Sequence, residues 1–142
     1  MRRFTLFFIL ILALSLALVA CGGDDGGSDA TEAEPTSGGD AARGEELYHQ
    51  TTIGSASAPG CVTCHSTEEG VTLVGPSHAG VATRAGTEAP DLSAAEFLEQ
   101  SIREPNAVVT EGFSPGVMYQ NYDNELTDQQ IDDLVAYLLT LK

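Results

Sequence analysis

Two cysteines and a histidine stand close together in the stretch GCVTCHSTEEG, as Cys61, Cys64 and His65. Residues of these types at this spacing can bind a metal ion, form a redox-active disulfide or attach a haem. A structural zinc site commonly takes its ligands as two close pairs, and no second C-x-x-C or H-x-x-x-H pair occurs in the chain. A thioredoxin-like dithiol needs flanking strands in a βαβ pattern, and none is predicted here.

The motif C-x-x-C-H, running from Cys61 to His65, is the attachment sequence of c-type haem. Its two thiols can add to the two vinyl groups of the porphyrin, and the adjacent histidine is then placed under the iron. An exported chain suits this chemistry, because bacteria attach haem outside the cytoplasm. We therefore predict one covalently attached haem c.

The first 20 residues predict a lipoprotein signal peptide. Arg2 and Arg3 precede an almost wholly apolar run over residues 4–19. The sequence LVAC, ending at Cys21, resembles a lipobox, in which the cysteine is acylated and becomes the mature N-terminus. A retained transmembrane anchor is the alternative, since the run approaches the ~20 residues that a bilayer needs.

Residues 21–40 predict a disordered tether behind the acylated cysteine. They contain glycine, small polar residues and six carboxylates, but no aromatic residue, Leu, Ile or Val. Such a segment cannot bury enough apolar surface to offset the entropy of ordering it. The rest of the chain, residues 41–142, has the length of one small domain.

Charge narrows the choice of partners. The chain has a formal net charge of −15, and beyond the signal peptide its only basic residues are Arg43, Arg84, Arg103 and Lys142. Nucleic acid is excluded as a partner, because binding it requires a basic stripe. An anionic membrane surface would repel the domain, so the lipid is the expected anchor. A protein partner should present a basic or a largely apolar surface.

Three helices are predicted from capping residues and apolar spacing. Asp40 caps the first, over residues 41–51. Capping boxes, Ser93 with Glu96 and Thr127 with Gln130, open helices over residues 94–103 and 128–142. We predict loops between these helices, over residues 51–60, 66–90 and 106–125. Loops this long are unusual in a small domain, and a large flat cofactor would give them something to pack against.

The domain resembles a class I c-type cytochrome over nearly its whole length. Gly44 and Tyr48 match the glycine and the aromatic residue at which the first helix of that family meets the last. The stretch DLVAYL matches the last helix, with Tyr137 as its packing aromatic, and GPSHAGVATRAG resembles the segment after the haem motif. The resemblance implies an all-α, cytochrome c-like fold in which the N- and C-terminal helices cross and haem lies between helices and long loops.

The resemblance also implies roles for residues outside the motif. Pro76 matches the proline whose carbonyl accepts a hydrogen bond from the ligating histidine, here His65. Arg84 matches the arginine near the haem propionates. Met118, the only methionine besides Met1, is the expected sixth ligand of the iron. His plus Met is a known axial pair in cytochromes c.

Other residues leave the ligand set open. His49 and His78 are rival sixth ligands, and a lone methionine such as Met118 can instead be core filling. Tyr119 stands where family members often carry a proline directly after the ligand. The loop between Tyr48 and Cys61 is also longer than in compact relatives.

A His–Met iron predicts a one-electron carrier, because it has no open position for a substrate. From residue 101 to Met118 the chain loosely resembles monohaem subunits of quinol-oxidising complexes such as alternative complex III. This implies a respiratory or photosynthetic role, as a complex subunit or a shuttle, on the outer face of the bacterial cytoplasmic membrane. The alternative is a haem enzyme or gas sensor whose sixth position is open or displaceable.

Overall fold

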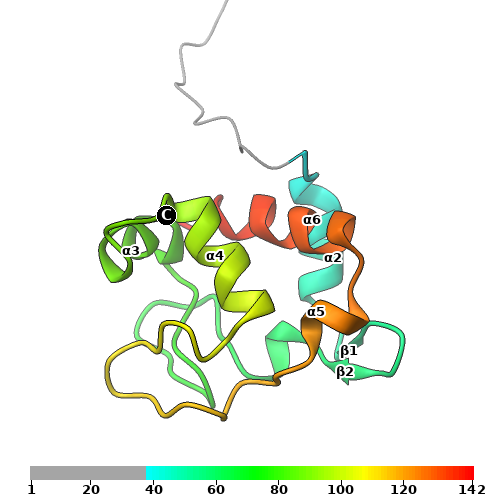
Figure 1. Cartoon of the computed structure of the whole chain (residues 1–142), viewed down its shortest axis with the longest axis horizontal. Coiled ribbons are helices and arrows are strands. Elements are labelled where there is room, and N and C mark those ends of the chain that lie inside the picture. Colours follow the sequence, from blue (N-terminus) through cyan, green and yellow to red (C-terminus); the bar gives the residue numbers. More distant parts are fainter. Residues whose placement is uncertain (1–37) are drawn as a thin grey trace, which may run out of the picture. The chain divides into compact units, whose positions relative to one another are not determined.

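The computed structural model describes residues 38–142, and the first and last helices of this part cross each other (Figure 1). These helices are α2 (Ala41–Tyr48) and α6 (Asp128–Leu138). At the crossing, a Cβ atom on Gly44 would lie 1.9 Å from the backbone oxygen of Asp133, so α2 can approach this closely only at a glycine. The predicted all-α fold with crossing terminal helices is confirmed.

Predictions for the N-terminal region fall largely outside this part of the chain. The signal peptide over residues 1–20, the acylated Cys21 and nearly all of the tether over residues 21–40 lie outside the described residues. Among residues 38–142, no helix combines the length and the apolar character needed to span a bilayer.

The three predicted helix starts are confirmed. In each case a side chain accepts a hydrogen bond from a backbone N–H of the first turn, which would otherwise lack a partner. The caps are Asp40 for α2, Ser93 with Glu96 for α4 (Ala94–Arg103), and Thr127 with Gln130 for α6. Two helices end earlier than predicted. Helix α2 ends at Tyr48 and not at residue 51, and helix α6 ends at Leu138 and not at residue 142.

Several short elements occur where loops were predicted. They are the hairpin of β1 (Thr52–Ile53) with β2 (Ala58–Pro59), and the helices α3 (Val81–Glu88) and α5 (Tyr122–Glu125). The prediction of loop was therefore wrong for the hairpin, for α5 and, over the longest stretch, for α3. Its sequence VATRAGTE has weak helix propensity, since it holds β-branched residues and Gly86. Burial of Val81 and Ala85 against the core supplies what local propensity lacks.

The core lies where α4 and α6 meet α2 and α3. α6 contacts both α2 and α4, and α4 also contacts α3. The largest fully buried side chains are Tyr48, Ile131, Leu134 and Val135. The two long loops, residues 64–80 before α3 and 104–121 after α4, lie together on one side of these helices (Figure 1).

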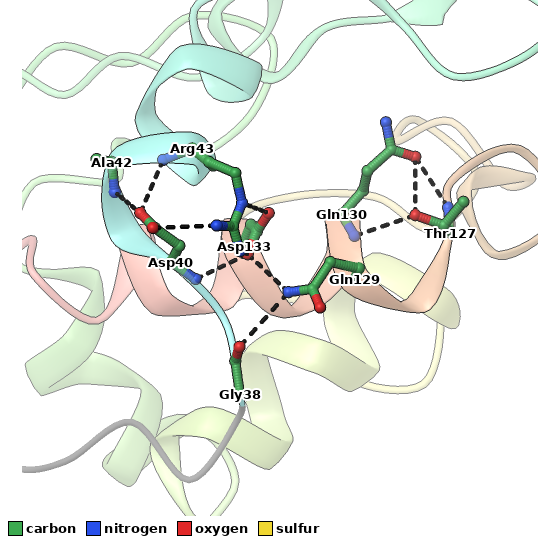
Figure 2. Close-up of polar contacts among 8 residues, drawn as sticks. All are labelled: Gly38, Asp40, Ala42, Arg43, Thr127, Gln129, Gln130 and Asp133. Carbon is green, nitrogen blue, oxygen red and sulfur yellow. Dashed lines mark hydrogen bonds and ion pairs between the residues drawn. The ribbon is translucent and has the colours of Figure 1, made fainter.

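Asp133, a buried carboxylate of α6, holds the start of α2 in place (Figure 2). It accepts hydrogen bonds from Nε and Nη2 of Arg43, each at 2.8 Å, and from the backbone N–H of Asp40 at 2.7 Å. Gln129 donates to it at 2.9 Å. The hydrogen bond from Arg43 lowers the pKa of Asp133 to about 2, although burial opposes the shift.

We expect Asp133→Asn to lower the free energy of unfolding at pH 7 by about 1–2 kcal/mol, because the charge-assisted hydrogen bonds from Arg43 are lost. The pKa of Asp133 is lower in the folded chain than its ordinary value of 3.8. The stabilisation is therefore present above about pH 4 and is lost as the pH falls toward 2. Denaturant unfolding followed by circular dichroism across this range would measure it.

The exposed Asp91 provides the matched control for this prediction. Asp91→Asn should change the free energy of unfolding by less than about 0.5 kcal/mol at every pH, as surface substitutions usually do. If Asp133→Asn destabilises equally at pH 7 and pH 2, the ionised carboxylate is not what joins α2 to α6.

Candidate functional site

A cavity of about 610 Å³ opens beside the motif from Cys61 to His65. Its lining includes all six residues predicted to hold or orient the cofactor, which are Cys61, Cys64, His65, Pro76, Arg84 and Met118. Apolar side chains of α4 and α6, among them Phe97 and Leu134, complete the walls. The volume lies within the ~300–1,000 Å³ typical of cofactor pockets.

The ring of His65 is oriented by a backbone carbonyl. Its Nδ1 lies 2.8 Å from the carbonyl oxygen of Pro76, and a carbonyl can only accept, so Nδ1 carries the proton. The lone pair of the imidazole is then on Nε2, the nitrogen available to a metal. Burial lowers the pKa of His65, which keeps the ring neutral at pH 7.

Gly75 makes room for this ring. A Cβ atom on Gly75 would lie 2.4 Å from Cε1 of His65 and 2.8 Å from its Nδ1. Any larger residue would push the imidazole away from its position beside Pro76. The sequence did not indicate a role for Gly75, because the residues next to it along the chain give no sign that it packs against the ring of His65.

We expect Gly75→Ala to displace His65 and to lower the free energy of unfolding of the haem-loaded protein by about 1–3 kcal/mol, as overpacking does. The absorption spectrum should show a larger high-spin fraction, since the imidazole no longer aligns with the iron. Gly38→Ala is the control, because a Cβ there would meet nothing within 4 Å. An unchanged spectrum in Gly75→Ala would show that the ring tolerates the added methyl group.

His78 lies beside His65 and also lines the cavity. The two rings are stacked, with centroids 4.0 Å apart and planes inclined by 14°. Nδ1 of His78 lies 3.1 Å from the hydroxyl of Tyr48. Desolvation and the neighbouring His65 lower the pKa of His78 well below its ordinary value of 6.5. Because His78 lies beside His65 and does not face it across the cavity, we expect His78 to support the ring of His65 and not to be the sixth ligand.

The other rival ligand lies elsewhere. His49 is exposed at the C-terminal end of α2 and is not part of the cavity lining. Its ring instead meets Tyr137, with centroids 6.3 Å apart.

Cys61 begins a short 3-10 helix, η1 (Cys61–Thr63), Cys64 caps the C-terminal end of that helix, and neither cysteine is in a disulfide. Desolvation raises the pKa of Cys61 to about 12. A redox dithiol instead depends on a thiolate with a lowered pKa. Within residues 38–142, no three Cys, His, Asp or Glu side chains group as a metal site would require. The geometry therefore favours neither the dithiol nor the zinc alternative.

Met118 lies in the loop between α4 and α5, and the residue after it anchors that loop. The hydroxyl of Tyr119 donates to the Glu125 carboxylate, whose other oxygen lies 3.3 Å from the backbone nitrogen of Ala56. The rings of Tyr119 and Tyr122 meet edge to face at 5.0 Å. The hydrogen bond from Tyr119 lowers the pKa of Glu125. Tyr119, which departs from the expected proline, thus fixes the loop by contacts of its own.

Arg84 lines the cavity and also holds the loop that follows Pro76. Its guanidinium donates to the carbonyl oxygens of Ala79 and, at 2.5 Å, of Ser77. Its Nε lies 3.7 Å from a carboxylate oxygen of Glu88. The predicted contact of Arg84 with a haem propionate stays a prediction.

These residues fit a covalently attached haem. Two unpaired thiols, a neutral imidazole with a free Nε2 and a thioether line one largely apolar cavity. Cys61, Cys64, His65 and Met118 would hold the group, while Pro76 and Gly75 set the orientation of the imidazole. Bound there, haem supplies an iron that changes oxidation state by one electron.

Comparison with known families agrees with this geometry. The family model described as Cytochrome c matches residues 41–142, which are more than half of the chain and include every residue of the cavity. No curated protein matches the chain.

Proposed function

Because the chain belongs to the cytochrome c family, we propose that it transfers single electrons through a haem held by His65 and Met118. Members of this family bind haem c covalently, and one haem is typical of a single domain. The observation that carries the proposal is the cavity whose lining unites both thiols of the motif, the imidazole of His65 and Met118. The chain is thus an electron carrier in this proposal and has no catalytic residue.

The residues of the site have distinct parts in this function. Cys61 and Cys64 would attach the group covalently, so that it would not be lost between reactions. His65 and Met118 would both ligate the iron, which would leave no position open to a substrate and keep rearrangement small when the charge changes. Met118 as a ligand would raise the reduction potential of the iron, and the hydrogen bond from His65 to Pro76 would make the imidazole a stronger electron donor.

A redox titration of the purified haem-loaded protein tests the proposal. The absorbance should follow a one-electron Nernst curve, and carbon monoxide should leave the spectrum of the reduced protein unchanged. If the iron is high-spin or binds carbon monoxide readily, the sixth position is open. The alternative class, a haem enzyme or a gas sensor, would then replace the electron carrier.

We further propose that a lipid on Cys21 ties the domain to the outer face of the bacterial cytoplasmic membrane, with residues 21–40 as the tether. The lipobox-like LVAC and the carboxylate-rich composition of the tether support this. The wild-type protein should partition into the detergent phase of a phase separation, and Cys21→Ser should move it to the aqueous phase. Equal partitioning of both would contradict the lipid anchor.

The loose likeness to subunits of quinol-oxidising complexes supports a role as such a subunit or as a shuttle from one. Its redox partner would present a basic or an apolar surface, and nucleic acid is no partner of so acidic a chain. Co-purification with other haem subunits after mild detergent extraction would indicate a subunit. Recovery of the protein alone would indicate a shuttle.

A further inference from the structure

The exposed large apolar side chains of the described residues all belong to two loops beside the cavity. They are Val71, Leu73, Val74 and Val117, here called the mouth surface, and their exposed fractions are 37%, 50%, 54% and 53%. Val74 and Val117 line the cavity itself, while Val71 and Leu73 precede Val74 in the same loop. A single exposed aliphatic residue needs no explanation, but a group around one opening commonly marks an interaction site.

The parts of these loops that carry the mouth surface are without charge, although Glu68 and Glu69 precede the first part, Glu111 precedes the second, and the chain as a whole is strongly acidic. Residues 71–83 and 112–122 contain no Asp, Glu, Lys or Arg, while the chain carries 21 carboxylates and a net charge of −15. The carboxylates therefore lie outside the two segments that carry the mouth surface. Because most carboxylates lie elsewhere and Glu88 of the cavity lining is paired with Arg84, a partner with a ring of basic residues would be drawn mainly to the acidic remainder of the domain.

We propose that the mouth surface is the docking site for a redox protein whose own contact face is apolar and uncharged. The inference rests on the proposed electron transfer and names the partner's chemistry for the same site. Apolar contact at the cavity removes water between the two redox centres and brings them close. A second copy of this chain is a poor occupant, because two domains of high negative charge repel each other.

Electrodes coated with alkanethiol monolayers of equal thickness provide the test, with the haem-loaded protein as the sample. On a methyl-terminated monolayer we expect fast electron transfer and adsorption that salt does not weaken. On an amine-terminated monolayer, adsorption through the acidic body should fall with salt, and electron transfer should be at least about tenfold slower, since the cavity faces away.

Substitutions at Leu73 test the surface itself, because Leu73 is half exposed and is not among the residues lining the cavity. Leu73→Asp should reduce adsorption to the methyl monolayer by about tenfold, and Leu73→Asn by less, in line with the loss of apolar area. Thr52→Asp adds the same charge at an exposed position of the hairpin and should leave both adsorption and electron transfer on the methyl monolayer unchanged. A quartz microbalance measures the adsorbed amount independently of electron transfer.

Other results would overturn the docking site. If Leu73→Asp leaves both adsorption and transfer unchanged, the mouth surface does not dock. If the wild type forms dimers or binds phosphatidylcholine vesicles and Leu73→Asp prevents it, the occupant is a second copy or a membrane. A reversible one-electron titration in solution shows that the proposed function stands even where docking fails. If the protein does not titrate reversibly with one electron, the proposed electron transfer and the proposed docking site both fail.

Discussion

Met118→Ala is expected to remove the weak long-wavelength sulfur-to-iron charge-transfer band from the absorption spectrum of the oxidised protein. It should also lower the reduction potential by about 0.1–0.3 V, a part of the ~0.8 V over which axial ligands set haem potentials. The physical reason is that a thioether ligand favours ferrous iron, so its loss favours ferric iron. Spectra of the purified wild type and variant, with a redox titration of each, measure both effects.

Two further variants make this test specific. Ala107→Ser changes an exposed side chain of the same loop that does not line the cavity, and it should leave the band and the potential as they are. His78→Leu removes the rival ligand and should keep the band. If Met118→Ala keeps a low-spin spectrum that His78→Leu abolishes, His78 is the sixth ligand. A wild-type protein without the band would exclude Met118.

Gly44→Ala should lower the free energy of unfolding by about 2–3 kcal/mol, the second large effect expected. The new Cβ would lie 1.9 Å from the carbonyl oxygen of Asp133 and 2.8 Å from Cβ of Tyr137. A backbone carbonyl cannot rotate away as a side chain can, so α2 and α6 must separate. That loss is a large part of the ~5–15 kcal/mol by which folded domains are stable. Denaturant unfolding of the haem-loaded protein measures it.

Gly86 in α3 is the matched control, because it too is a helical glycine but an exposed one. A Cβ on Gly86 would meet nothing within 4 Å. Gly86→Ala should therefore stabilise the protein by up to about 1 kcal/mol through helix propensity alone. If both alanine variants stabilise, the approach of α2 to α6 does not depend on Gly44.

The sequence by itself determined the features that are encoded within a few residues. The spacing of Cys61, Cys64 and His65 indicated the cofactor, because thiols and imidazole must be adjacent to meet one porphyrin. The caps at Asp40, Ser93 and Thr127 marked where helices begin, since a cap acts only on the next turn of backbone. The all-α fold followed from these starts together with the resemblance to cytochromes.

Tertiary structure alone decided what depends on contacts between distant segments. Helix α3 forms because the core buries Val81 and Ala85, although its own propensity is weak. Two further contacts also join segments that are apart in the sequence. Gly75 leaves space for the ring of His65, and Glu125 accepts a hydrogen bond from Tyr119. A residue's chemistry can be read from its type, but its neighbours are set by how the whole chain packs. The apolar mouth surface likewise exists only because the fold brings two uncharged loop segments, residues 71–83 and 112–122, to the border of one cavity.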